Sequence, residues 1–162
     1  MKTRAVLLAA GLGTIVLHSL PAFAAQSKSL SILAGIDNGG VALGANFDVN
    51  DSPNEAYGGY ARVFSKDKEE GAPAIFAFGA EFRGQTKIGL FEYYMSPGFG
   101  VIHHNYDDTR LLFGPSLAIG MTAELDKNSS LGIENTKLYS WAGHYKGLIK
   151  DAFLAQYRMS FN

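Results

Sequence analysis

Large apolar residues alternate with small or polar ones along much of this chain. The alternation is clearest at 41–49 and at 74–83, where aliphatic and aromatic side chains are separated by residues such as Gly44 and Glu81. Successive residues of a strand point to opposite faces, so this period of two predicts strands with one apolar face. No stretch of similar length follows the 3.6-residue period of a helix.

Weaker alternating runs raise the number of expected strands to eight. They span residues 28–36, 39–49, 55–65, 73–83, 86–103, 109–125, 129–140 and 147–161. Short polar turns are expected at 50–54, 84–85 and 126–128, and they alternate with connections at 37–38, 65–72, 104–108 and 141–146. The predicted fold class is all-β, an eight-stranded antiparallel up-and-down transmembrane β-barrel. In a barrel of eight strands, side chains fill the interior, so we expect no open pore.

The last part of the eighth expected strand, residues 151–161, favours a membrane barrel over a soluble one. Every second residue from Phe153 to Phe161 is apolar or aromatic. A terminal strand of this kind is typical of outer-membrane barrels, where we expect it to close the barrel and to engage the barrel-insertion machinery. The alternative is a soluble barrel of the lipocalin type, with its apolar face inward around a ligand. Small or charged residues on the opposing face, such as Gly79 and Arg158, suit a narrow lumen better than a ligand cavity.

The start of the chain has the features of a signal peptide. Basic residues precede an apolar run at 5–17, and Ala22 and Ala24 are small residues of the kind that a signal peptidase accepts. The apolar run is shorter than a helix needs to span a bilayer. We therefore expect residues 1–24 to be removed, leaving one barrel domain at 25–162 in the bacterial outer membrane.

The composition limits the chemistry available to the chain. There is no cysteine among its 162 residues, so neither a disulfide framework nor a thiolate metal site can form. A formal charge of −1 gives no electrostatic reason to expect nucleic acid as a partner. His103 and His104, followed by Asp107 and Asp108, resemble metal ligands, but adjacent residues of a strand point to opposite faces. We expect no metal site and no cofactor.

The segment 131–143 and the strand after it carry a more specific pattern. Ser140, Ala142 and Gly143 match the run His-any-Ser-Asn-Ala-Gly that ends the seventh strand of the PagL-type lipid A 3-O-deacylases, and Asp151 stands where those proteins have an acidic residue. In this respect the chain resembles that family of eight-stranded outer-membrane barrels. The resemblance implies contact with outer-membrane lipids, including lipid A. It also implies Ser140 and Asp151 as the candidate catalytic residues of an ester hydrolase.

The catalytic motif departs from the family at two positions. Leu138 occupies the position of the general base, and Trp141 replaces the asparagine after the serine. An insertion of one residue would put Lys137 in the base position instead. A serine without a base is a weak nucleophile. We therefore predict a non-enzymatic envelope or lipid-A-contacting protein.

Two alternative functions remain at this point. The first is lipid A 3-O-deacylation by Ser140 and Asp151 with a relocated base. The second is surface adhesion through the extracellular loops, of which the mixed-charge segment at 66–70 is the most polar. The sequence leaves the oligomeric state open.

Alternation also predicts where polar residues face. Asp151 shares its parity with Phe153 and Phe161, so we expect it to face lipid. Ten residues at a typical strand tilt place it about 25 Å above Phe161, at the outer interface. On the opposite face, charged side chains are expected to form a network inside the lumen, because buried charges need partners of opposite sign. These residues are Glu81, Arg83, Glu124 and Arg158.

Overall fold

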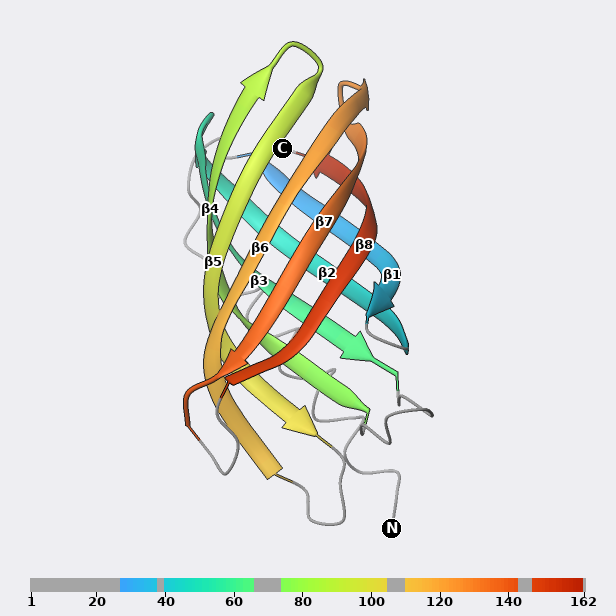
Figure 1. Ribbon diagram of the computed structural model, residues 1–162. Helices are drawn as coiled ribbons and strands as arrows, with labels where there is room; N and C mark the ends of the chain where they lie inside the picture. Colours follow the sequence, from blue (N-terminus) through green and yellow to red (C-terminus); the bar gives the residue numbers. More distant parts are fainter. Residues whose placement is uncertain (1–26, 38–39, 66–73, 105–109, 143–146, 162) are drawn as a thin grey trace.

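The chain forms a closed barrel of eight antiparallel strands in which each strand pairs with its neighbours in sequence (Figure 1). The computed structural model describes residues 27–37, 40–65, 74–104, 110–142 and 147–161. The strands are β1 (Lys28–Asp37), β2 (Gly40–Ser52), β3 (Glu55–Phe64), β4 (Ile75–Ile88), β5 (Phe91–His104), β6 (Arg110–Asp126), β7 (Ser129–Ser140) and β8 (Gly147–Phe161). No helix long and apolar enough to cross a membrane occurs within these described residues. The predicted fold class is confirmed.

One expected turn was wrong. Residues 84–85 do not form a turn but lie within β4, where Gly84 pairs with Met95 and Gln85 with Tyr94. The turn comes at Gly89 and Leu90, with Gly89 at a φ of 64° that favours glycine. The alternation continues to Ile88, and a polar Gly-Gln pair is compatible with a strand whose inner face is polar. The β4–β5 hairpin is therefore longer than predicted.

The barrel closes through its terminal strands, as the pattern of β8 predicts. Lys28 pairs with Phe161 and Asp37 with Ala152, which joins β1 to β8 along the whole length of β1. The tight turns and the end of β8 lie at one end of the barrel, at the top of Figure 1. We call this the tight-turn end, and the opposite end, where β1, β3, β5 and β7 end, the long-loop end.

The strand register sets the height of each residue on the wall. Positions in register can be followed once around the barrel, and they return to β8 ten residues further along the chain. In order they are Asp151, Lys137, Leu117, Pro97, Phe82, Tyr57, Val49, Lys28 and Phe161. A stagger of ten residues over eight strands tilts the strands strongly. Asp151 therefore lies about 25 Å from Phe161 along the barrel axis, toward the long-loop end.

The outer face of the wall is apolar and the lumen is largely polar. Large apolar side chains such as Ile32, Leu43, Phe78 and Phe153 point outward and are exposed. A soluble barrel of the lipocalin type has the reverse arrangement. The alternation therefore has the orientation expected of a membrane barrel.

The lumen itself has two parts. Toward the long-loop end, buried apolar side chains pack into one cluster, which consists of Leu33, Ala42, Tyr60, Phe64, Ile75, Ala77, Ile102, Leu112, Leu138, Ala152 and Leu154. Toward the tight-turn end, the inward side chains are charged or hydrogen-bonding. Among the described residues, the polar part opens into a cavity at the tight-turn end.

Candidate functional site on the outer wall

Strands β7 and β8 bring three polar side chains together on the outer face. Lys137 and Asp151 are directly paired across the two strands, and Asn135 lies two residues before Lys137 on the same face. We call Asn135, Lys137 and Asp151 the outer polar cluster. A bulge in the pairing follows at Leu138 and Tyr139, where β8 contains one residue more than β7.

Both oxygens of the Asp151 carboxylate are bound within this cluster. Lys137 Nζ donates to Oδ2 in an ion pair. Asn135 Nδ2 donates to Oδ1 at 2.7 Å and to the Ala152 carbonyl at 3.2 Å. About 30% of each side chain of the ion pair remains exposed, so the cluster is accessible from outside the barrel.

The cluster interrupts an otherwise apolar wall. On the side toward the tight-turn end, its neighbours Leu131 and Ile133 on β7 and Phe153 on β8 are exposed apolar residues. A lysine ammonium has three donors and a carboxylate has about four acceptor positions, so each partner keeps capacity beyond the ion pair. The arrangement can hold a polar or charged headgroup beside apolar chains.

Ser140 does not belong to this cluster. It lies on the inner face, is 1% exposed, and its hydroxyl donates to the Ala142 carbonyl at 3.2 Å. Asp151 lies on the outer face, so the wall separates the two candidate catalytic residues. The structure does not bring Ser140 and Asp151 together.

The residue that accompanies Asp151 on the outer face is Lys137. Leu138 is fully buried in the lumen as part of the apolar cluster. Trp141 is highly exposed and packs edge-on against Phe99 at 6.3 Å between ring centroids. Sequence reasoning did not identify Asn135, because neither its type nor its spacing distinguishes it until the register of β7 is known.

Several other predicted features lie outside the described residues. These are the segment 1–24, the loop at 66–70, and Asp107 with Asp108. His103 is half-buried on β5. No group of three or more histidine, cysteine, aspartate or glutamate side chains that could hold a metal occurs in the described part of the chain.

Inside the lumen, buried charges do have partners of opposite sign, but the four predicted residues do not form one network. Arg83 is within 3.9 Å of Glu81 and 2.9 Å of Asp48, and Arg158 pairs with Glu92. The expectation for Glu124 was wrong. It is exposed at the tight-turn end and pairs with Lys87, because β6 carries it beyond the packed interior.

A second network crosses the middle of the lumen. Arg62 Nη2 donates to Glu134 at 2.6 Å and its Nη1 donates to Asn46 at 2.5 Å. Tyr94 donates to Glu134 at 2.9 Å and lies 2.7 Å from Gln156. These bonds join five strands of the wall, β2, β3, β5, β7 and β8, to one another through the lumen.

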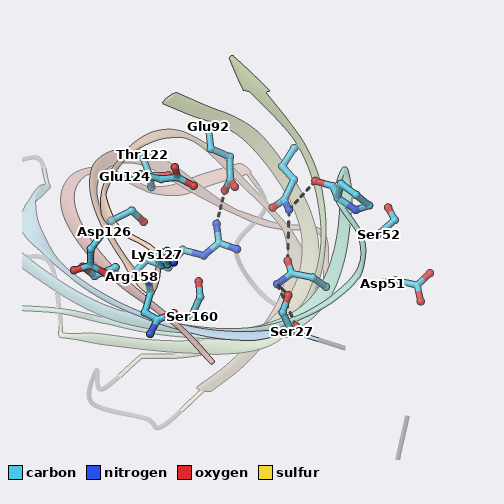
Figure 2. Close-up of a pocket in the computed structure, with 16 residues that line it drawn as sticks. Ser27, Asp51, Ser52, Glu92, Thr122, Glu124, Asp126, Lys127, Arg158 and Ser160 are labelled. Carbon is cyan, nitrogen blue, oxygen red and sulfur yellow. Dashed lines mark hydrogen bonds and ion pairs between the residues drawn. The ribbon is translucent and has the colours of Figure 1, made fainter. Parts of the chain in front are cut away.

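A cavity of about 620 Å³ opens at the tight-turn end (Figure 2). Its lining includes the pair of Arg158 and Glu92. It also includes Gln85, which donates to Asn50 and to the Pro53 carbonyl. Pockets for small ligands are mostly apolar with a few polar groups. This cavity is polar almost throughout, and the buried cation among its lining residues, Arg158, is already paired with Glu92.

Comparisons with known proteins identify the fold. The barrel superposes on Neisserial surface protein A with a TM-score of 0.62 and 10% identity, covering 84% of this chain and 96% of that one. It superposes on the N-terminal β-barrel domain of Pseudomonas aeruginosa OprF with a TM-score of 0.67 and 9% identity, covering 83% and 97%. A de novo designed transmembrane β-barrel gives a TM-score of 0.60 and 12% identity, covering 83% and 95%.

Sequence comparison adds nothing to this result. No family model matches the chain, and no curated protein matches it. At such low identities the structural likeness shows the fold alone, which is that of the small eight-stranded outer-membrane β-barrels.

Proposed function

We propose that this chain is a bacterial outer-membrane protein that contacts lipid headgroups, including those of lipid A, through the outer polar cluster and performs no hydrolysis. The location of the cluster carries the proposal. Lys137 and Asp151 lie on the lipid-facing wall, about one hydrophobic thickness away from the tight-turn end.

The location in the outer membrane is supported by the apolar exterior. A belt of exposed Ile, Leu, Val and Phe side chains surrounds the barrel. Such a belt is unfavourable in water and favourable in hydrocarbon. The terminal strand β8, which ends at Phe161, is the segment through which we expect the barrel-insertion machinery to recognise the chain.

The proposal excludes hydrolysis because the outer polar cluster lacks a nucleophile. Attack on an ester needs a hydroxyl or thiol within hydrogen-bond reach of a base. Ser140 is on the other face of the wall, bonded to a backbone carbonyl. The Asp151 carboxylate is already bound by Lys137 and Asn135.

The test compares the double variant K137M/D151N with the wild type in two membranes. The full chain is refolded into nanodiscs of phosphatidylcholine and into nanodiscs that also contain lipopolysaccharide, and urea unfolding is followed by heat-dependent gel migration. Lipopolysaccharide should stabilise the wild type more than the double variant. The matched control is K87M/E124Q, which removes an ion pair at the tight-turn end and should respond to lipopolysaccharide as the wild type does.

Two results would contradict the proposal. Equal stabilisation of K137M/D151N and the wild type would remove lipid headgroups from the function of the cluster. Loss of a 3-O acyl chain from the lipid A of cells that produce the protein, detected by mass spectrometry, would show that it is a hydrolase.

A further inference from the structure

The charges inside the lumen do not balance. Among the described residues, five carboxyl groups and four cationic groups are buried there or nearly so. Four ion pairs use every cation once, namely Arg62 with Glu134, Arg83 with Asp48, Lys150 with Asp37, and Arg158 with Glu92. The fifth carboxyl group is that of Glu81, which has only a longer contact with Arg83, the cation already paired with Asp48.

The nearest cation to Glu81 is already engaged. Arg83 Nη2 is 3.9 Å from Glu81 Oε1, beyond hydrogen-bond distance, whereas Arg83 Nη1 is 2.9 Å from Asp48. The guanidinium also lies over the Tyr94 ring, and its Nε donates to Ser96 at 3.2 Å. Arg83 is thus held toward Asp48.

The Glu81 carboxyl group is almost completely shielded from solvent, and one of its oxygens has no donor. Its side chain is 2% exposed, and Oε1 has no hydrogen-bond partner among the described residues. An ionised carboxylate in such a place loses its hydration without compensation.

The remaining groups around Glu81 supply no spare positive charge. Arg62 on β3 is bound by Glu134, and Glu134 on β7 and Asp48 on β2 are acids themselves. Tyr60 on β3 is a neutral phenol, and β5 faces Glu81 with Gly98. Every charged group that acts on Glu81 is therefore either already paired or negative.

We infer that Glu81 is a lumenal binding site for one proton, which the folded barrel binds more tightly than the unfolded chain does and which compensates the surplus carboxyl group. The proton neutralises the acid and leaves the Arg83–Asp48 pair intact. This proton site is independent of the lipid contact proposed above, because it lies inside the barrel and depends on the fold alone.

The inference has a thermodynamic consequence with a definite sign. In the unfolded chain, Glu81 is solvated and releases its proton above pH of about 4. The folded barrel then binds one proton more than the unfolded chain, so stability falls as the pH rises. The unfolding equilibrium constant should increase by a factor of about ten per pH unit from this site while the folded barrel keeps the proton.

The direct test is Glu81→Gln, which keeps the shape of the side chain without its titration. Urea unfolding of the full chain in phosphatidylcholine vesicles is measured between pH 5 and pH 8. E81Q should lose the tenfold contribution per pH unit that the wild type shows. The same pH dependence in both proteins would overturn the inference.

A second variant tests the charge balance without changing Glu81. Asp48→Asn removes the acid that holds Arg83, so that Arg83 becomes available to Glu81 and no proton is needed. D48N should also lose the tenfold dependence. The control E124Q removes an exposed acid at the tight-turn end, which is not one of the five lumenal carboxyl groups, and should keep the dependence. Retention of the dependence in D48N would overturn the role of surplus charge.

The compensating charge has one other chemical source. An alkali cation would neutralise Glu81 as well as a proton does. Wild-type stability that rises with sodium concentration, but not with falling pH, would therefore overturn the assignment of a proton. An infrared carbonyl band of a protonated carboxyl group, present in the wild type and absent from E81Q, supports it independently.

Discussion

Lys137 and Asp151 stand opposite each other on β7 and β8 and form an ion pair on the outer face of the barrel. A polar pair in this position faces lipid. We therefore expect contacts with lipid headgroups on the outer wall and not in the lumen.

Single substitutions in this pair should act in opposite directions. Asp151→Asn leaves the Lys137 ammonium without its counter-charge, which should increase the attraction for anionic headgroups. Lys137→Met removes the cation and should decrease it. Each change is about 1 kcal/mol or less, because the pair is partly exposed.

These effects are measured as the difference in unfolding free energy between vesicles with and without an anionic lipid. Shifts of the same sign for D151N and K137M would show that the lysine charge does not determine the lipid contact.

Ser140→Ala should leave lipid A unchanged and alter the barrel little. The substitution removes one hydrogen bond to the Ala142 carbonyl inside the wall, which is worth about 1 kcal/mol. The measurements are urea unfolding of the variant and mass spectrometry of lipid A from cells that produce it. A lipid A profile that differs between wild type and S140A would reinstate Ser140 as a nucleophile.

Arg62 should be essential for stability through Glu134. Arg62→Met leaves a buried carboxylate without its cation, which costs about 3–5 kcal/mol. The double variant R62M/E134L removes both charges and should recover a large part of this loss. Urea unfolding monitored by heat-dependent gel migration gives both values, and equal stability of the single and the double variant would disprove the pairing.

Gly114 is required because β7 approaches β6 closely at this point. A Cβ at Gly114 would lie 2.0 Å from the Tyr139 carbonyl oxygen, so Gly114→Ala forces the strands apart at a cost of about 1–3 kcal/mol. Gly84→Ala is the matched control, since no heavy atom lies within 4 Å of its Cβ. Unfolding free energies that fall equally in both variants would mean that strand propensity, and not the close contact, explains the loss.

The barrel should not conduct ions. The apolar cluster that includes Phe64, Leu112 and Leu138 fills the long-loop part of the lumen. In planar bilayers, the purified full chain should therefore give no stable conductance steps. Reproducible steps, absent from a mock purification, would show that the cluster opens.

The sequence predicted most of the fold for a simple reason. Alternation in β8 and β2 is a local property, so it gave the strands, their apolar face and the outward direction of Asp151 without any knowledge of neighbours. It failed at 84–85, where a polar dipeptide inside a strand resembles a turn.

The candidate site depended on more than alternation. In β7 the residues from Asn135 to Ser140 mix polar and apolar types, so neither face is marked as the outer one. A shift of one residue exchanges Lys137 for Leu138 beside Asp151. Only pairing with β6 and β8 fixed Lys137 outside and Ser140 inside.

The sequence by itself therefore determined a barrel with an apolar exterior and an acid, Asp151, on its outer face, because the alternation of residue types is a local property of each strand. The tertiary structure decided which side chains meet, because contacts across strands depend on register and closure. It separated Ser140 from Asp151 by the thickness of the wall, joined Asp151 to Lys137 and Asn135, and left Glu81 to share Arg83 with Asp48.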